Sequence, residues 1–400
     1  MSNVVQSLAD PRAAGRRRIA YVHDTNVFGG METLLLSMLQ HLDLARYEPH
    51  VLVPGYRDRW RQSPPRLLQL LGEAGVPVLR PSAPPRVPAI GALVDVFNIA
   101  ATLRRARIEI VHVHTRHPEA ARRATLSAWL ARVAGILRTE HLPPGPHVGR
   151  FTRYSVVPFD AMTDVIFTDS DSDRLEQIRV VGRCPGKLVR SYCGIDAARY
   201  DPDHDVAEAK RKLGFDPAVP LVGAIGRLHV QKGHTFLIDA AARVLRESGP
   251  VRYVLVGSGP LQQELQASVE RLGIADRFSF AGFQADYIAY MQALDIAVMP
   301  SLWEGFSIAM QEFMALAKPL VVTDHPSFLE AIRHEQHGLV VPRGDSGALA
   351  AAIESLLRDP PLAHRLGRAA RQRVLSDFGI EHHMRQLMDH YERLLRQRRP

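Results

Sequence analysis

The chain alternates short apolar runs with longer segments in which apolar residues recur every three or four positions. Short apolar runs bounded by glycine, proline or polar residues are typical of buried strands, and a period near 3.6 residues is typical of helices. Strands that alternate with helices predict a parallel sheet covered on both faces. In the first half the strand candidates are RRIAYVHD, PHVLVPG, IEIVHVHT, AGILRTEH and DVIFTDS.

The same alternation restarts near residue 219, with the strand candidates VPLVGAIGRL, VRYVLVGSG, FSFAGF, LDIAVMPS, KPLVVTD and HGLVVP. Turn signals between the halves predict a hinge near Cys193–Tyr200, and the proline-rich stretch Arg80–Gly91 is predicted to be a long loop. We therefore expect an α/β architecture of two doubly wound parallel-sheet domains, with ligands at the carboxyl ends of the strands. The expected divisions are 1–198, 199–376, and a C-terminal helix with a basic tail at 377–400.

The composition agrees with two ordinary globular domains. A chain of 400 residues is too long for one core, and 46% hydrophobic with 23% charged residues is a common balance. No apolar stretch approaches the about 20 residues of a membrane-spanning helix. The N-terminus lacks the long apolar region of a signal peptide, so we expect a cytoplasmic protein in which Cys184 and Cys193 are reduced.

The formal net charge is +8, with arginine clusters near both ends, at Arg16–Arg18 and at Arg396, Arg398 and Arg399. A basic balance favours anionic partners such as nucleotides, nucleic acid or the inner membrane leaflet, and solvated tails explain it equally well. The basic residues are not interleaved with aromatic ones on a recognisable nucleic-acid module, so we expect no nucleic-acid partner. A peripheral contact with an anionic membrane stays open.

Two carboxylates follow the strand candidate LDIAVMPS. Glu304 and Gly305 lie in the predicted strand-to-helix loop, and Ser307 is in the position of a helix N-cap. Glu312 lies more than one turn into that helix. A carboxylate in this place can accept two hydrogen bonds from a ribose diol, whereas Glu304 and the flexible Gly305 suit a close approach to a hydroxyl-rich group.

Two cations occupy a second loop of the same kind. In GAIGRLHVQKG, Arg227 and Lys232 follow a buried strand and precede a helix expected to open at Gly233. Amide N–H groups at a helix N-terminus and two cationic side chains together form an anion site. The P-loop pattern is absent from the chain. Diphosphate, ribose and hydroxyl-rich groups together describe a nucleotide sugar.

From about Ile19 to Leu395 the sequence resembles the retaining glycosyltransferases of family 4, which have the GT-B fold of two facing Rossmann-like domains. The resemblance rests on GRLHVQKG, VLVGSGP, FAGF, VMPSLWEGFSIAMQEFMA and HGLVVPRGD, in the family's order and spacing. It implies an active site in the cleft between the domains. It also implies transfer of a hexosyl unit from a UDP- or GDP-linked sugar to a hydroxyl acceptor on a glycan, a lipid-linked saccharide or a small molecule.

The resemblance also implies a role for each matching residue on the donor side. Arg227 and Lys232 would neutralise the leaving diphosphate. Glu312 would bind the ribose, and Glu304 the sugar. Phe283 and Gln284 would lie against the base, and Gly257 is a further donor-binding position. The backbone of Gly305, Phe306 and Ser307 would bind the sugar together with Glu304.

On the other side, NVFGGMET resembles the family's glycine-rich loop and puts Gly29 and Gly30 against phosphate or acceptor. LRTEHLPPG puts His141 where the family often keeps a histidine beside the reacting sugar. Two turns depart from the family pattern, Cys193–Asp196 in place of Asn-Gly-Val-Asp and Asp324–Ser327 in place of Asp-Val-Gly-Gly. The second departure weakens any inference about that donor loop.

Two weaker patterns resemble metal sites. His112 and His114 share one face of a strand, but no third ligand has a recognisable spacing, so we interpret them as residues near a strand end. The run Asp169–Asp173 opens a helix, where Asp and Ser are ordinary caps. We expect no metal and no cofactor. Fixed protein cations would then stabilise the leaving group, and transfer would be metal-independent.

Two alternatives stay open for the function. A nucleotide-sugar epimerase of the same fold would consume the donor without an acceptor. A non-catalytic nucleotide-binding or nucleic-acid-binding protein is suggested only by the charge. At the C-terminus, HYERLLRQRRP is predicted to be a basic helix that crosses back onto the first domain, with arginines that contact lipid phosphates or solvent.

Overall fold

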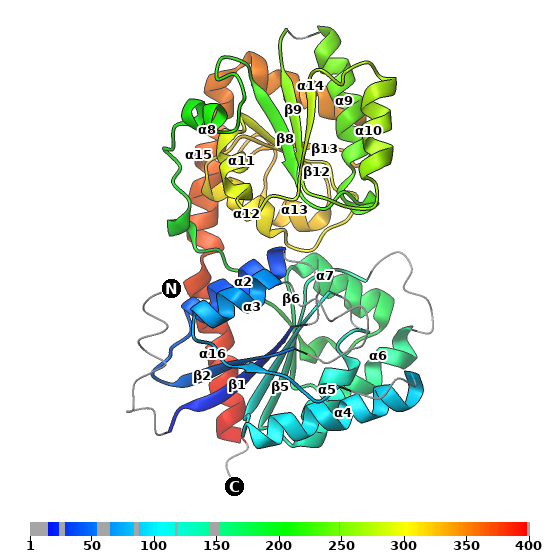
Figure 1. Cartoon of the computed structure of the whole chain (residues 1–400), viewed down its shortest axis with the longest axis vertical. Coiled ribbons are helices and arrows are strands. Elements are labelled where there is room, and N and C mark those ends of the chain that lie inside the picture. The colour runs from blue at the N-terminus through cyan, green and yellow to red at the C-terminus, as the bar shows by residue number, and fades with distance from the viewer. Residues whose placement is uncertain are drawn as a thin grey trace. The chain divides into compact units, whose positions relative to one another are not determined.

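The computed structural model describes residues 15–23, 29–53, 65–83, 88–116, 119–144, 152–247 and 249–397. They form two compact units (Figure 1). The first unit comprises Met1–Gly194 and Ile380–Pro400, and the second comprises Ile195–Gly379. The chain passes from the first unit to the second within the stretch predicted as a hinge, and it returns at the start of the last helix.

The first unit has a sheet of seven parallel strands in the order β3-β2-β1-β4-β5-β6-β7. The chain winds outward in both directions from β1 and β4, which confirms the doubly wound topology predicted for this half. The strands are β1 (Arg17–His23), β2 (Tyr47–Leu52), β3 (Val78–Leu79), β4 (Ile110–Thr115), β5 (Gly135–Glu140), β6 (Val165–Thr168) and β7 (Leu188–Arg190).

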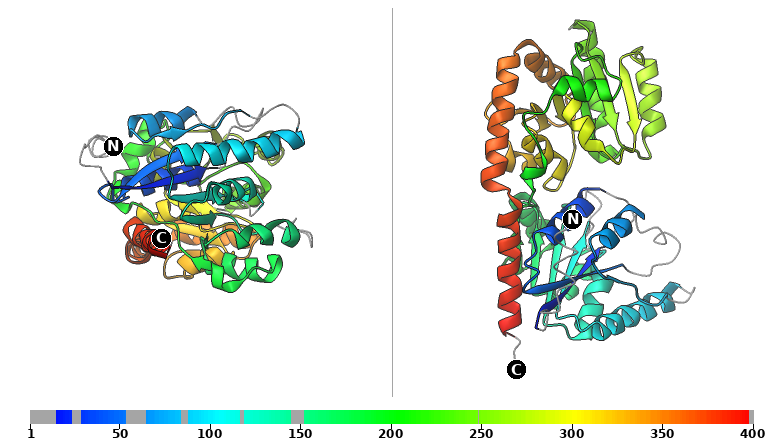
Figure 2. Two further views of the ribbon diagram at one scale, coloured as in Figure 1. Left: turned by 90° about the horizontal axis from the view of Figure 1, so that it is seen from below. Right: turned by 60° about the vertical axis from the view of Figure 1, so that its left-hand side comes forward.

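Helices cover both faces of this sheet. The right-handed connections put α2 and α3 on one face, together with α16, which lies along the sheet and contacts β5 (Figure 2). The other face carries α4, α5 and α6, with a core of aliphatic residues from β1, β4 and β5. The helices are α2 (Gly30–Gln40), α3 (Pro65–Glu73), α4 (Pro88–Arg105), α5 (Arg122–Ala131), α6 (Thr152–Ala161), α7 (Asp171–Glu176) and α16 (Ile380–Gln397).

The second unit has a sheet of six parallel strands in the order β10-β9-β8-β11-β12-β13. All six predicted strands are present, and the direction of winding reverses between β8 and β11. The strands are β8 (Leu221–Ile225), β9 (Arg252–Val256), β10 (Phe278–Gly282), β11 (Ile296–Met299), β12 (Leu320–Thr323) and β13 (Leu339–Val341).

One face of the second sheet packs against α9, α10 and α14, and its core is built around them. The opposite face carries α11, α12 and α13, with α8 against α11 and α15 against α12. The helices are α8 (Val206–Lys212), α9 (His234–Glu247), α10 (Gln262–Arg271), α11 (Tyr287–Ala293), α12 (Ile308–Ala315), α13 (Pro326–Ala331), α14 (Ser346–Arg358) and α15 (Pro360–Asp377).

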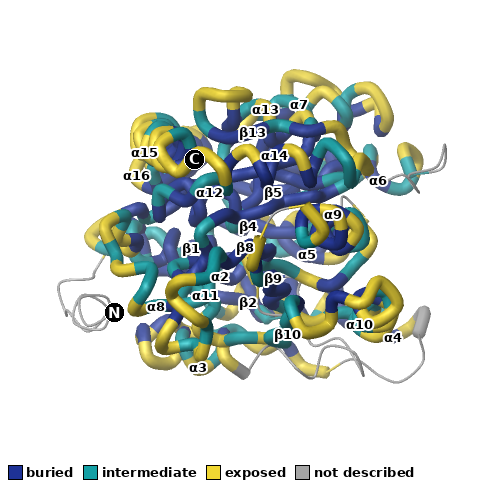
Figure 3. The backbone as a smooth tube through the Cα atoms, turned by 90° about the horizontal axis from the view of Figure 1, so that it is seen from above, coloured by how far each residue is buried: buried dark blue, intermediate teal, exposed yellow. Residues whose placement is uncertain are grey.

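Both sheets are buried on both faces, as all-parallel sheets usually are. Strands β4 and β5 have the dark blue of buried residues, whereas the outer sides of α10 and α15 are yellow (Figure 3). Two expectations from the sequence were wrong. The short strands β3 and β7 were not predicted, and the last four residues of the predicted loop Arg80–Gly91 already belong to α4. Proline is well tolerated at the first position of a helix, so Pro88 does not prevent the start of α4.

Candidate active site

The carboxyl ends of β8 and β11 lie side by side in the second unit, because these two strands are hydrogen-bonded neighbours. The connections that leave them run to opposite faces of the sheet, which makes this the topological switch point where open α/β sheets bind ligands. Arg227 and Lys232 follow β8, and Glu304 follows β11. The fold therefore brings the predicted cations and the first predicted glutamate to one place.

The two loops are locked together by close packing. Gly233 ends the 3-10 turn Val230–Lys232 with a φ of 62°, and a Cβ at this residue would lie 2.0 Å from the carbonyl oxygen of Pro300. The backbone N–H of Leu302 also donates to the carbonyl of Gln231 at 2.8 Å. Only glycine fits at residue 233, so the cation loop is held directly against the end of β11.

Glu304 is the centre of a small polar cluster. Its carboxylate forms an ion pair with Lys232 Nζ and accepts from Ser301 Oγ at 3.2 Å and Gln231 Nε2 at 3.3 Å. Arg227 is exposed, and its Nη2 donates to Gln231 Oε1 at 3.3 Å. Gln231 thus contacts both Arg227 and Glu304. The cluster contains two cations, Arg227 and Lys232, and one carboxylate, Glu304.

The backbone of Glu304 is fixed by the segment that departs from the family pattern. His325 Nε2 accepts from the amide of Glu304 at 3.5 Å, and Ser327 Oγ donates to the carbonyl of Glu304 at 3.4 Å. His325 Nδ1 is hydrogen-bonded to Ser327 Oγ at 2.8 Å. Burial lowers the pKa of His325 to about 4, and the nearby charge of Arg343 acts in the same direction. The ring therefore stays neutral, and Nε2 can accept a hydrogen bond. His325 and Ser327 therefore support the loop that carries Glu304, although the sequence of Asp324–Ser327 departs from the family pattern.

Glu312 lies in α12, which begins at Ile308 after the predicted N-cap Ser307, whose hydroxyl accepts from Met310 N at 3.5 Å. The carboxylate is buried, and its Oε1 accepts from Tyr287 at 2.6 Å and from Tyr200 at 2.8 Å. Burial raises the pKa of Glu312 to about 7, against the lowering effect of these two hydrogen bonds. Glu312 is thus poised between its neutral and ionised forms near neutral pH.

The remaining donor-side positions fall into two groups. Phe283 follows β10, and because its ring is 59% exposed it can stack on a base. The side-chain amide of Gln284 donates to the carbonyl of Ala281 at 2.6 Å. Phe306 is buried against Phe378, with ring centroids 4.9 Å apart, so its ring is not available to a ligand. Gly305 is also buried.

Gly257 has a structural explanation of its own. Its φ is 139°, and a Cβ there would lie 2.0 Å from the carbonyl oxygen of Gly226, at the end of β8. The close approach of two loop backbones therefore requires glycine at this position, whether or not a ligand lies beside it.

In the first unit, the glycine-rich loop is tied to the sheet by Glu32. Its Oε2 accepts from the amide of Gly29 at 2.7 Å, and its Oε1 lies 2.8 Å from Nε2 of His23. Gly30 begins α2. The amide of Gly29 therefore has a partner inside the protein, and the role of Gly29 and Gly30 at a phosphate or acceptor stays a prediction. Residues 26–28 of NVFGGMET lie outside the described residues.

His141 follows β5 and is buried among polar groups. Its Nδ1 donates to Asp169 Oδ2 at 2.8 Å, because a carboxylate can only accept, and its Nε2 lies 3.1 Å from Nδ1 of His114. The His114 and His141 rings are stacked with centroids 5.4 Å apart. Burial and the neighbouring histidines hold the pKa of His114 well below its usual range. A neutral His114 therefore completes a chain that fixes the orientation of the His141 ring.

Asp169, His141 and Cys193 have ligand-type atoms within 4.8 Å of one another. Two ligands of a tetrahedral Zn²⁺ would be roughly 3.3 Å apart, whereas the His141–Asp169 distance is 2.8 Å, that of a direct hydrogen bond. The Cys193 sulfur lies 3.9 Å from His141 Nδ1. Burial raises the pKa of the Cys193 thiol, and the charge of Asp169 raises it further. The arrangement fits a hydrogen-bonded cluster with a protonated thiol.

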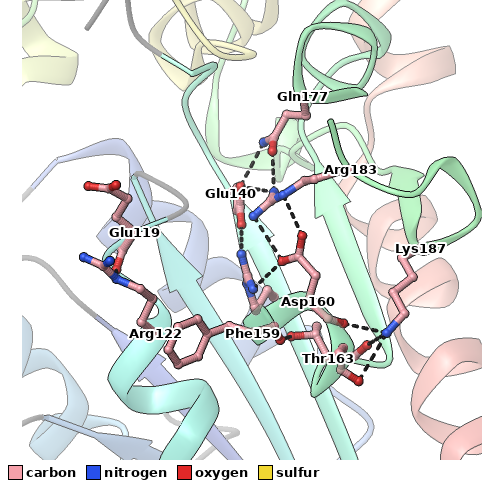
Figure 4. A network of polar contacts seen from close by, with 11 residues as sticks. Glu119, Arg122, Glu140, Phe159, Asp160, Thr163, Gln177, Arg183 and Lys187 are labelled. Carbon is pink, nitrogen blue, oxygen red and sulfur yellow. Dashed lines mark hydrogen bonds and ion pairs between the residues drawn. The ribbon is translucent and has the colours of Figure 1, made fainter. Parts of the chain in front are cut away.

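The residue before His141 anchors this strand end. Glu140 accepts from Arg183 Nη1 at 2.6 Å and from Gln177 Nε2 at 2.9 Å, and it forms an ion pair with Arg138 (Figure 4). Asp160 binds the same two arginines. All five side chains are buried, and the two arginines lower the pKa of Glu140 to about 2, although its burial alone would raise it. The network keeps the carboxyl end of β5 in place.

Some of the residues that complete the site were not predicted. Gln231, Tyr200 and Tyr287 contact the predicted glutamates, but no local pattern marks them. Asp169 was interpreted as part of a helix cap, whereas the N-cap of α7 is Ser170, which accepts from Asp173 N at 3.1 Å. The parallel register pairs Glu140 with Thr168, so the next residue on each strand, His141 and Asp169, could have been paired from the sequence.

The predicted place near a strand end fits His114, which is the residue before the last of β4, whereas His112 is the third of its six residues. Its Nδ1 lies 2.7 Å from the hydroxyl of Tyr391 in α16, and its Nε2 lies 2.7 Å from Thr139 Oγ1. Both ring nitrogens thus have partners.

Within the described residues no helix is long and apolar enough to cross a membrane. Arg398 and Arg399, which were predicted to contact lipid or solvent, lie outside the described residues.

Two units, each built on a doubly wound parallel sheet, are the architecture of the GT-B fold. The structure of HepE from Anabaena in complex with UDP and glucose superposes with a TM-score of 0.80, covering 94% of this chain and 100% of that one, at 21% identity. This similarity establishes the fold.

The sequence comparisons establish the family. The family model for "Glycosyltransferase Family 4" matches residues 28–199, and the family model for "Glycosyl transferases group 1" matches residues 205–373. The chain therefore belongs to the group 1, family 4 glycosyltransferases, enzymes that transfer a sugar from a nucleotide-sugar donor.

Two curated relatives illustrate the range of the family. The lipopolysaccharide core biosynthesis mannosyltransferase LpsB of Rhizobium meliloti is 33% identical over 210 residues, which cover 51% of this chain and 60% of LpsB. The 2-deoxystreptamine N-acetyl-D-glucosaminyltransferase of Streptomyces fradiae is 28% identical over 401 residues, covering 93% of this chain and 92% of that enzyme.

Proposed function

We propose that the chain transfers a hexosyl unit from a UDP- or GDP-linked sugar to a hydroxyl acceptor, with retention of configuration and without a metal ion. The observation that carries the proposal is the cluster of Arg227, Lys232 and Glu304 at the switch point of the second sheet. Cations that lie beside a carboxylate suit a substrate with a diphosphate next to a hydroxyl-rich group.

In the proposed reaction the bond between the anomeric carbon and the diphosphate oxygen breaks, and a bond from that carbon to the acceptor oxygen forms. Negative charge develops on the leaving diphosphate, and Arg227 and Lys232 stabilise it as a bound divalent cation would. The acceptor attacks from the face that the diphosphate leaves, and its proton passes to the departing phosphate oxygen. Glu304 holds the sugar hydroxyls during this exchange.

Glu312 is proposed to bind the ribose, and Phe283 to lie against the base. His141, which Asp169 and His114 orient, is proposed to contact the reacting sugar. HepE was crystallised with UDP and glucose, and LpsB is a mannosyltransferase, so UDP-glucose and GDP-mannose are the first donors to test. Relatives act on lipopolysaccharide core or on 2-deoxystreptamine, which makes both glycans and small polyols reasonable acceptors.

The test is a transfer assay with UDP-, GDP- and ADP-linked hexoses, with and without acceptor, in the presence and absence of EDTA. We expect release of nucleoside diphosphate that depends on the acceptor and survives EDTA. Conversion of the donor without acceptor would favour an epimerase. Loss of transfer on chelation, restored by Mg²⁺ or Mn²⁺, would contradict the metal-independent mechanism. Salt-sensitive retention on DNA without nucleotide-sugar binding would favour the non-catalytic alternative.

A further inference from the structure

Helix α4 of the first unit is apolar on both of its sides. Its inner side is buried and carries Val96, Ile99 and Leu103. Its outer side carries Ile90, Leu93 and Phe97, which are 56%, 59% and 55% exposed. The spacings of three and four place these outer residues on one face of the helix. A surface helix normally has a polar outer face, and an apolar one indicates a surface that another phase or molecule covers.

The outer face of α4 continues into basic residues. Ala101 is exposed on the same face, and the helix ends with the exposed pair Arg104 and Arg105. Arg104 donates to the carbonyl of Leu130, which fastens this end of α4 to the neighbouring helix α5. Trp129, the residue directly before Leu130 in α5, has a side chain that is 51% exposed. The apolar face of α4 therefore ends in arginines, and the neighbouring helix α5 exposes a tryptophan.

The exposed charges on helices α4 and α5 are of one sign. Helices α4 and α5 together carry Arg104, Arg105, Arg122 and Arg123, and their only acidic residue, Asp95, is buried. A second copy of the chain docked through the same face about a two-fold axis would place these arginines against their own counterparts. An anionic lipid surface complements them, and Leu, Phe and Trp side chains insert at the boundary between head groups and acyl chains.

We propose that the outer face of α4, from Ile90 to Arg105, docks the chain on a membrane that contains anionic lipids. The helix would lie in the plane of the interface, with its apolar residues toward the acyl chains and its arginines at the head groups. Because α4 connects the end of β3 to the start of β4, its N-terminal half is directed toward the carboxyl edge of the sheet, the edge that carries His141. The docking does not depend on which donor or reaction the enzyme uses.

The test is co-sedimentation of the full chain with phosphatidylcholine vesicles, with and without phosphatidylglycerol, at low and high salt. We expect binding only to the anionic vesicles, weakened by salt. Leu93→Ser with Phe97→Ser should weaken it at least about ten-fold, because two apolar side chains that enter the membrane are replaced by polar ones. Arg104→Gln with Arg105→Gln should weaken it and reduce its salt dependence.

The matched control is Leu272→Ser with Leu375→Ser, which replaces two exposed leucines of the second unit that are 37% and 46% exposed. This control should bind vesicles like the unchanged chain. All variants should keep their melting temperature and nucleotide-sugar binding, because only exposed side chains change; if the double variant does unfold, Leu93→Ser alone repeats the test. Failure of the unchanged chain to bind anionic vesicles, or equal binding by the α4 variants, would overturn the proposal. So would a dimer in solution that Leu93→Ser with Phe97→Ser dissociates, since the face would then belong to a second copy.

Discussion

Lys232 and Glu304 form an ion pair within the second unit, although 72 residues separate them in the sequence. Lys232 is one of the two cations proposed to hold the donor diphosphate, so Glu304 already neutralises one of the two charges on which the proposal relies. A diphosphate must draw Lys232 away from Glu304 or share it. Under the proposed function, Glu304 would be both a ligand of the sugar and a competitor of the diphosphate for Lys232.

This double role predicts opposite effects of Glu304→Gln on two ligands. Affinity for a free nucleoside diphosphate should stay the same or increase, because Lys232 is no longer paired. Turnover of the nucleotide sugar should fall about ten-fold or more, because a charge-assisted hydrogen bond of roughly 1.5–3 kcal/mol to the sugar is lost. Calorimetric titration and initial rates measure the two effects. Glu264→Gln, at an exposed glutamate of α10, is the control, and an equal loss of affinity for both ligands would contradict the assignment.

Glu312 predicts a pH dependence of donor binding. Its pKa is raised to about 7 by burial, while its contacts Tyr287 and Tyr200 and the nearby charge of Arg199 favour ionisation. A ribose diol donates two hydrogen bonds, so it needs the ionised form, and affinity should rise as the pH increases through about 7. A nucleotide sugar is the right ligand, because its diphosphate carries no terminal phosphate that titrates in this range. In Glu312→Gln the affinity should be lower and flat with pH.

The same shift predicts a change in stability. The folded-state pKa of Glu312 lies above its ordinary value of 4.5, so the folded chain holds a proton that the unfolded chain has lost between these two values. The contribution of Glu312 to stability is therefore present in full below about pH 4.5 and is lost as the pH rises to about 7 and beyond. Glu312→Gln should remove this part of the pH dependence, as measured by denaturant unfolding of the donor-free protein.

His141 is expected to act on turnover and not on donor binding. His141→Ala should lower kcat while the dissociation constant of the nucleotide sugar stays nearly unchanged. Asp169→Asn should have a smaller effect in the same direction, because it disturbs the 2.8 Å contact that orients the ring. Cys193→Ser, in the same cluster but without a proposed role, is the control. An unchanged kcat in His141→Ala would remove this residue from the site.

The buried network behind His141 predicts a large effect on stability. Arg183→Leu leaves Glu140 and Asp160 without one of their two arginines in a buried place, which should lower the free energy of unfolding by roughly 3–5 kcal/mol. Arg190→Leu breaks a half-exposed pair with Asp171 and should cost less than about 1 kcal/mol. Urea unfolding compares the two variants. Equal, small effects would show that the network contributes little.

The fold was predictable where the strands are long and buried on both faces. Continuous apolar runs such as IEIVHVHT and VRYVLVGSG mark the central strands, because both faces of a parallel sheet require apolar residues. The edge strand Val78–Leu79 has two residues and Leu188–Arg190 has three, too few to form a recognisable run. The start of α4 was missed because three prolines before Pro88 indicated a loop.

The site was predictable as far as each residue's place at a strand end. Arg227, Lys232 and Glu304 could be assigned because they directly follow β8 and β11, whose carboxyl ends must meet if the strands are neighbours. The contacts of Tyr200 and Tyr287 with Glu312 depend on how α11 and the segment near residue 200 pack, and no local spacing encodes such long-range partners. The engagement of the Gly29 amide by Glu32 was missed because the loop was judged by its glycines alone.

The central claim is that Arg227 and Lys232 hold the donor diphosphate, and the most direct measurement is calorimetric titration of UDP-glucose and GDP-mannose in the presence of EDTA. The unchanged chain should bind one of these donors. Arg227→Ala with Lys232→Ala should bind it about a hundred-fold more weakly or worse, since each charged contact contributes about ten-fold or more. Arg271→Ala, at an exposed arginine of α10, should bind it normally. Binding by the double variant as tight as that of the unchanged chain, with the fold intact, would contradict the account.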